Sequence, residues 1–216
     1  MAITRLNPVL YHFYPTLYSF KNMNIKPEQL PNNLQNRLEP VYFIFGSEIL
    51  LVEQSLTTIK DAAKKQGFND RIRFDIDGNF SWDIIFSAIS SPSLFAENRI
   101  IECHLTTGKI GVKGSKSLTE LTESLPDDIL LIISAGKLDK AQQKSKWFKA
   151  LDKKGVTIQH WEVQSEYLVG WINNQMAQLD LKPNNEVANA IAYCTEGNLL
   201  ASIQEIQKLQ IAYPDG

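Results

Sequence analysis

Between residues 40 and 161 the sequence alternates short apolar runs with segments whose apolar residues recur at helical spacing. The run Ile129–Ile133 contains only leucine and isoleucine, which is typical of a central parallel strand buried on both faces. An alternation of this kind predicts an α/β fold, in which helices cover both faces of a parallel sheet. The predicted strands are 41–45, 71–76, 100–105, 129–133 and 156–161.

Two segments between these strands matter for function. A helix is predicted directly after the first strand, with Ser47 as its N-cap and Gly67 at its end. A long polar helix is predicted over 140–153, with Trp147, Phe148 and Leu151 turned inward.

The pattern changes after Trp161. Three helical patterns follow, starting near Tyr167, Pro183 and Asn198, and no strand pattern separates them. We therefore expect an α/β domain over 23–163 and a small helical domain over 164–216. Residues 1–22 contain five aromatic residues without clear periodicity and lack the smooth apolar run of a secretory signal, so we interpret them as an extension outside the fold.

Composition excludes several classes of protein. With 44% hydrophobic residues the chain can bury a core, and a net charge of -2 argues against coating nucleic acid by bulk electrostatics. The two cysteines, Cys103 and Cys194, are far apart, which fits a reducing compartment without a disulfide framework. No apolar run approaches the length needed to span a bilayer.

A parallel α/β domain followed by three helices resembles the layout of the AAA+ ATPases, whose phosphate-binding loop follows the first strand. Such a loop needs two glycines, a lysine and a hydroxyl in the pattern Gly-x-x-x-x-Gly-Lys-Ser/Thr. Counting from Gly46, this chain has Leu51, Val52 and Glu53 at the second glycine, lysine and hydroxyl positions. The end of the 100–105 strand also lacks the acidic pair that holds a metal. We therefore predict a degenerate nucleotide site, no cofactor and no ATP hydrolysis.

Other catalytic or metal-binding chemistry has little support in the sequence. His104 and His160 are isolated from each other and from any metal-ligand spacing, so we interpret them as structural residues at strand ends. Asp75 and Asp77 could hold a cation, but a turn beginning at Asp77 explains them more simply. We predict no catalytic residues and no metal site.

The loop 90–97 places Leu94 beside Phe95 in a segment that otherwise has surface character. The residues alone favour a pair tucked onto the core, while the alternative is a pair offered to a partner. A second candidate surface is the segment 137–154, whose seven lysines and two aspartates leave a charge of +5. A solvated helix face explains this segment most simply, and a contact with DNA or an acidic partner is the functional alternative, with three candidate residues: Lys140, Lys144 and Lys146.

Several segments, taken in their order and spacing, are similar to the delta subunit family of the bacterial DNA polymerase III clamp loader. The resemblance runs from Met23 to Gly216 and is carried by six segments: 42–53, 74–77, 93–95, 127–133, 137–140 and 193–200. It implies an AAA+-like protein, an accessory part of the polymerase holoenzyme, that binds the sliding clamp (beta) and promotes its opening without hydrolysing ATP.

Residue by residue, the resemblance implies that Ser93, Leu94 and Phe95 bind the clamp, which reverses the preference for a core tuck. It also implies a bacterial cytoplasmic location, delta prime and gamma/tau subunits as further partners, and primer-template DNA reached through the complex. The family's collar domain would follow Gly216. Two alternatives are an active AAA+ ATPase such as a helicase loader, and a scaffold fragment that does not bind the clamp.

Overall fold

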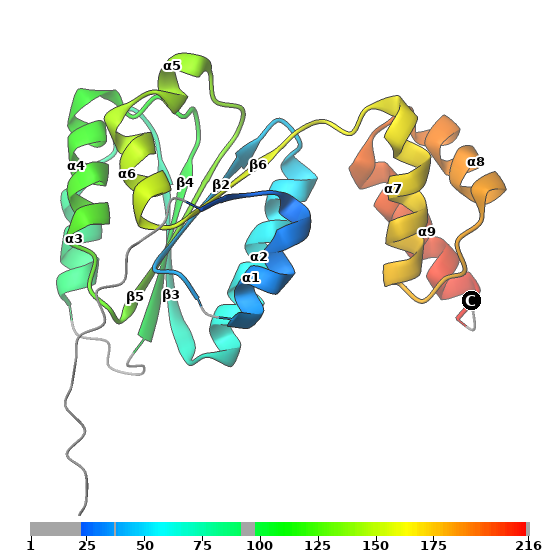
Figure 1. Cartoon of the computed structure of the whole chain (residues 1–216), viewed down its shortest axis with the longest axis horizontal. Coiled ribbons are helices and arrows are strands. Elements are labelled where there is room, and N and C mark those ends of the chain that lie inside the picture. The colour runs from blue at the N-terminus through cyan, green and yellow to red at the C-terminus, as the bar shows by residue number, and fades with distance from the viewer. Residues whose placement is uncertain (1–22, 37, 92–97, 215–216) are drawn as a thin grey trace, which may run out of the picture.

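The computed structural model describes residues 23–36, 38–91 and 98–214. Within these residues six strands form one sheet in the order β1-β6-β2-β5-β4-β3, and each pairing is parallel. Figure 1 shows this sheet with helices on both sides. The strands are β1 (Met23–Ile25), β2 (Val41–Gly46), β3 (Phe68–Ile76), β4 (Asn98–Leu105), β5 (Ile129–Ala135) and β6 (Val156–His160).

The five predicted strands are confirmed, and β5 is buried along its whole length. Two details differ from the prediction. The edge strand β3 starts at Phe68, three residues before the predicted start, and the sheet has a sixth strand, β1. The three residues of β1 carry no strand pattern of their own and form a strand because they pair in register with Val156–Ile158 of β6.

One face of the sheet is covered by three helices: α3 (Asp83–Ser90), α4 (Gly111–Glu123) and α6 (Lys146–Lys154). Alternate residues of β2, Val41, Phe43 and Phe45, point into this layer, where Phe43 packs edge-on against Trp147 at 5.8 Å. The opposite face is covered by α1 (Leu30–Asn36) and α2 (Ile49–Lys65), with η1 (Pro27–Gln29) before them. The two layers account for the complete burial of the central strands β2 and β5.

The prediction of one long polar helix over 140–153 is wrong. It is two helices, α5 (Lys140–Gln143) and α6, separated at Lys144 and Ser145. The break follows from local hydrogen bonding, because the Ser145 hydroxyl accepts the amide of Phe148 and so starts a new helix. The predicted inward residues are correct, since Trp147 and Leu151 are buried and Phe148 is partly buried.

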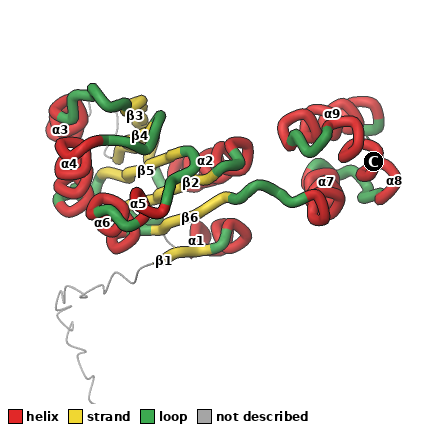
Figure 2. The backbone as a smooth tube through the Cα atoms, turned by 90° about the horizontal axis from the view of Figure 1, so that it is seen from above, coloured by secondary structure: helices red, strands yellow, loops and turns green. Residues whose placement is uncertain are grey.

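After β6, the described residues form three helices: α7 (Ser165–Gln178), α8 (Asn185–Thr195) and α9 (Leu199–Ala212). They share their own apolar core, which Leu50 and Leu51 of α2 also contact. In α8 the buried residues are Ala188, Ile191 and Thr195, and Cys194 is exposed. Figures 1 and 2 show this unit beyond α1 and α2, joined to β6 by an extended segment. Among the described residues, none of the helices has the length and apolar character to cross a membrane.

Candidate functional site

The turn between β2 and α2 occupies the place of an AAA+ phosphate-binding loop, and it is too tight to enclose a phosphate. Gly46 pairs with His160 of β6, and the amide of Ser47 donates to the His160 carbonyl at 3.2 Å. A Cβ atom at Gly46 would lie 2.0 Å from that carbonyl oxygen. Only two residues then separate β2 from α2, so the backbone does not form the wide loop that cradles phosphate oxygens.

The start of α2 is occupied by the chain itself. Glu48, and not the predicted Ser47, is the N-cap, and its carboxylate accepts the amide of Leu50 at 3.4 Å. A carboxylate there takes the favourable position that an anion would take at a helix N-terminus. Val52, which stands where a phosphate-binding loop has its lysine, is buried in the core. Leu51 packs against the three-helix unit, and Glu53 is exposed. No cation or hydroxyl from these positions faces a phosphate site.

The side chain of His160 also contacts α2, the helix that follows this turn. Its ring Nε2 lies 2.8 Å from the Ser55 hydroxyl of α2, and both side chains are buried. Burial lowers the pKa of His160 to about 4, against a smaller opposing effect of the Glu28 carboxylate. The ring is therefore neutral at physiological pH. This agrees with the prediction that His160 is a structural residue.

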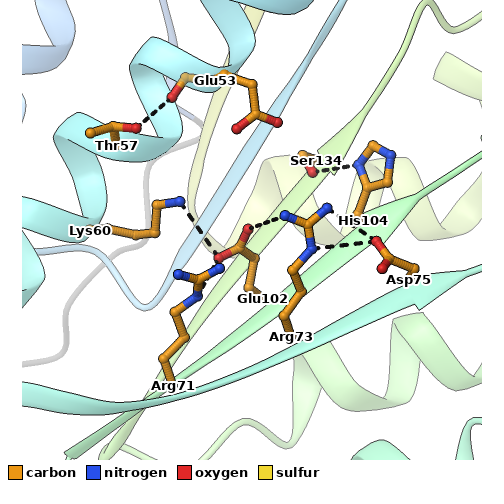
Figure 3. A network of polar contacts seen from close by, with 9 residues as sticks. All are labelled: Glu53, Thr57, Lys60, Arg71, Arg73, Asp75, Glu102, His104 and Ser134. Atoms are coloured by element: carbon orange, nitrogen blue, oxygen red, sulfur yellow. Dashed lines mark hydrogen bonds and ion pairs between the residues drawn. The ribbon is translucent and has the colours of Figure 1, made fainter.

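A cluster of charged residues lies between α2 and the edge of the sheet (Figure 3). At its centre is Glu102 of β4, a carboxylate that is only 1% exposed. Arg71 Nε lies 2.8 Å from it, and Arg73 and Lys60 lie at 3.7 and 3.9 Å. These three cations compensate the buried charge, which would otherwise cost several kilocalories per mole. The cluster ties α2 to β3 and β4.

The polar residues at the ends of the strands also have partners within the protein. His104 Nδ1 lies 3.0 Å from the Ser134 hydroxyl, and Arg73 pairs with Asp75 at 3.2 Å (Figure 3). Asp77 accepts the amide of Asn79 at 2.9 Å, as the predicted turn requires. In the described part of the chain no three metal-ligating side chains come together.

The predicted clamp-binding residues Ser93, Leu94 and Phe95 lie outside the described residues. Their surroundings are described: α3 ends at Ser90 and β4 starts at Asn98. Because every pairing in the sheet is parallel, Asn98 lies on the side of the sheet where the strands begin. The β2–α2 turn lies on the other side, where the strands end.

The three candidate lysines lie at the carboxyl-end side of the sheet, where α5 follows β5 (Figure 1). Lys140 begins α5, Lys144 is its C-cap and Lys146 begins α6, and all three are exposed. The structure therefore places them on one solvent-facing connection. Trp147, next in the chain, faces the core.

Sequence reasoning missed Glu48 as the cap and the pairing of His160 with Ser55. A glutamate two residues after a strand-ending glycine is a weak signal for the first. The second contact joins residues 105 positions apart, and no local pattern predicts it.

A parallel sheet of this order, a degenerate turn in place of the phosphate loop and a following three-helix unit define an AAA+-like protein. The fold is similar to that of Thermotoga maritima RuvB, a Holliday junction branch migration motor, with a TM-score of 0.53 and 11% identity over 87% of this chain and 62% of that one. It is also similar to the Bacillus subtilis DNA clamp loader delta protein, with a TM-score of 0.63 and 20% identity over 85% of this chain and 56% of that one.

The sequence identifies the family within this class. The family model for DNA polymerase III, delta subunit, matches residues 42–160. DNA polymerase III subunit delta of Escherichia coli is 34% identical over 194 residues, which cover 90% of this chain and 57% of the relative. The chain belongs to the DNA polymerase III delta subunit family, and it spans a little over half the length of the curated relative that it matches.

Proposed function

We propose that this chain binds the sliding clamp of the replication machinery through Ser93, Leu94 and Phe95 and favours the opened ring. The observation that carries the proposal is membership of the delta subunit family together with an adjacent Leu-Phe pair between α3 and β4. In that family such a pair inserts into a hydrophobic pocket of the clamp.

The energy available from such a pair is sufficient for stable binding. Burying a large apolar side chain contributes about 1.5–3 kcal/mol, so two contribute about 3–6 kcal/mol. Each 1.4 kcal/mol corresponds to about tenfold in affinity, so loss of both side chains weakens binding by roughly two to four decades. Ring opening then needs no chemistry, because a partner that binds the open ring more tightly shifts the population toward it.

We propose further that the chain neither binds nor hydrolyses ATP and acts as an accessory subunit of the polymerase holoenzyme. The buried Val52 and the carboxylate cap of Glu48 support this proposal. An active ATPase of the same fold, such as a helicase loader, is the rival interpretation. It would need a cation and a hydroxyl at this turn, where the chain has Val52 and Glu53.

The proposal extends to the other partners of a clamp loader. Delta prime and gamma/tau subunits and primer-template DNA would meet the full-length protein in the bacterial cytoplasm. The exposed Lys140, Lys144 and Lys146 form the surface that we propose for a contact with DNA phosphates, because lysines at one solvent-facing connection can neutralise neighbouring phosphates.

The test is binding of the chain to its cognate sliding clamp, measured by calorimetry with and without Mg-ATP. We expect binding in the absence of nucleotide, no heat from Mg-ATP alone, and a loss of at least about a hundredfold in affinity for Leu94→Ala/Phe95→Ala. A matched control is Val112→Ala/Ile211→Ala, which removes two apolar side chains that are 90% and 82% exposed elsewhere. Equal affinity of wild type and Leu94→Ala/Phe95→Ala would remove the pair from the site, and saturable ATP binding would favour the rival ATPase.

A further inference from the structure

Two leucines at the start of α2 form an apolar contact between the α/β unit and the three-helix unit. Leu50 and Leu51 are half-buried, and both pack against the apolar core formed by α7, α8 and α9. Counted from Gly46, they stand at the last variable position and the second glycine position of a phosphate-binding loop. Positions that belong to the nucleotide site of an AAA+ ATPase are therefore used here to join the two units.

Much of the boundary between the two units is open. A cleft of about 1170 Å³ lies there, lined by residues of η1, α1, α2, β6 and α7. Its lining includes Trp161 and Tyr167, which are 63% and 65% exposed and so are not held in an interface. The connection between the units, residues 161–164, is neither helix nor strand. Two units joined in this way are expected to move relative to each other unless an apolar contact prevents it.

A polar contact lies beside the two leucines. One turn further along α2, Gln54 Nε2 donates to Oε1 of Gln175 in α7 at 3.4 Å. A hydrogen bond of this length is weak, so it contributes less to holding the units together than the apolar contact does. From the connection, Val163 also packs against the core of the three-helix unit. The start of α2 and the connection thus meet the three-helix unit at one place.

We propose that Leu50 and Leu51 form a latch that holds the three-helix unit in one orientation against the α/β unit without a bound nucleotide. A ligand that contacts two units links their orientations, and here the chain makes that link with its own side chains. The link depends on apolar surface removed from water, which does not vary with the supply of ATP. This inference rests on the proposed function in one respect, the absence of nucleotide binding. The chain then presents its surfaces in one arrangement whether or not ATP is available.

The test measures the distance between the two units by pulsed electron paramagnetic resonance, without nucleotide. One spin label is attached to Cys194, which is exposed on α8, and the other to Lys64→Cys at an exposed position of α2. The remaining thiol, Cys103, is fully buried and therefore inert to the label. We expect one narrow distance distribution when the latch is intact. In Leu50→Ala/Leu51→Ala the population outside the main peak should rise about tenfold, which corresponds to a change of about 1.4 kcal/mol.

Two control variants separate the latch from a general effect on the fold. Ile49→Ala/Val112→Ala removes apolar side chains that are 71% and 90% exposed, one of them next to the latch, and should leave the distance distribution unchanged. Leu50→Met/Leu51→Met keeps the volume and apolar character of the latch and should retain the narrow distribution. Thermal unfolding followed by circular dichroism establishes that each variant is folded at the temperature of the measurement.

Equal distributions for the intact latch and the double alanine variant would overturn the proposal, and so would a broad distribution when the latch is intact. The single variants Leu50→Ala and Leu51→Ala keep the test decisive if the double variant does not fold. Each should broaden the distribution by a smaller amount, and an unchanged distribution in both would overturn the proposal in the same way.

The latch and the proposed function fail in different experiments. The distance measurement uses neither ATP nor clamp, so it decides the latch whatever the binding experiments show. Saturable binding of Mg-ATP in calorimetry would overturn the proposed absence of nucleotide binding. When Mg-ATP is added to the labelled chain, we expect the distance distribution to stay the same. A shift of the main peak would mean that a nucleotide sets the orientation of the three-helix unit, and it would overturn the latch.

Discussion

Between pH 7 and pH 5 the wild-type chain should lose stability because His160 takes up a proton on unfolding. The His160→Gln variant should lack this part of the loss. In the folded chain, burial lowers the pKa of His160 to about 4 from its usual 6.5. Between these two values the unfolded chain binds a proton that the folded chain does not. The stability contributed by this group is therefore fully present above pH 6.5 and is lost as the pH falls toward 4.

The size of the effect follows from the two pKa values. Linkage gives a destabilisation of about 0.2 kcal/mol at pH 7 and about 2 kcal/mol at pH 5 from this one residue. Other groups also titrate over this range, so the quantity to measure is the difference between wild type and variant. Glutamine is a suitable replacement because its amide does not titrate and can still hydrogen-bond the Ser55 hydroxyl, which lies 2.8 Å from the histidine ring.

The assay is urea unfolding at pH 7 and pH 5 for the wild type and His160→Gln, followed by circular dichroism. We expect the wild type to lose about 2 kcal/mol more than the variant between these pH values. An NMR titration of the histidine ring protons measures the same pKa directly, and the chain has only three histidines to assign. Equal pH dependence of the two proteins, or a midpoint for His160 near 6.5, would refute the reasoning.

Two further predictions concern the turn after β2 and the lysine surface. Gly46→Ala should destabilise the chain by about 3 kcal/mol in urea unfolding, because the new Cβ would meet the His160 backbone. Gly136→Ala, where a Cβ meets nothing within 4 Å, is the control, and equal stabilities of the two variants would contradict the geometry. If the lysine surface contacts duplex DNA, a triple alanine variant should reduce the slope of log affinity against log salt by up to about 2.7, as measured by fluorescence anisotropy on primed DNA. An unchanged slope would exclude the substituted residues, Lys140, Lys144 and Lys146, from the contact.

The sheet was predictable from the sequence because its central strands are buried on both faces. Every position of β5 is buried, so every residue is apolar or small, and such a run has few other structural interpretations. The strand β1 was not predictable in this way. Its three residues lie at an edge, and they form a strand only because β6 offers a partner in register.

The degenerate turn after β2 could also be predicted from the sequence. A phosphate-binding loop needs a lysine and a hydroxyl at fixed distances from its first glycine, and this chain has Val52 and Glu53 there. The side chain that caps the start of α2, where a phosphate would otherwise bind, could not be predicted from the sequence. The cap by Glu48 depends on where α2 begins, and a shift of one residue from Ser47 changes which side chain reaches the helix amides.

The sequence by itself determined five strands of the sheet, the helical unit that follows them and the loss of the phosphate-loop residues after β2, because all of these depend on local spacing. The tertiary structure decided that His160 meets Ser55 and that Arg99 meets Asp70 and the end of α3. Arg99 lies near the start of β4 and has no signal of its own in the sequence. Arg99 becomes buried only when β3, β4 and α3 pack together. The same packing supplies the hydrogen-bond partners that offset the cost of burying its charge, and these partners are distant in the chain or belong to other elements.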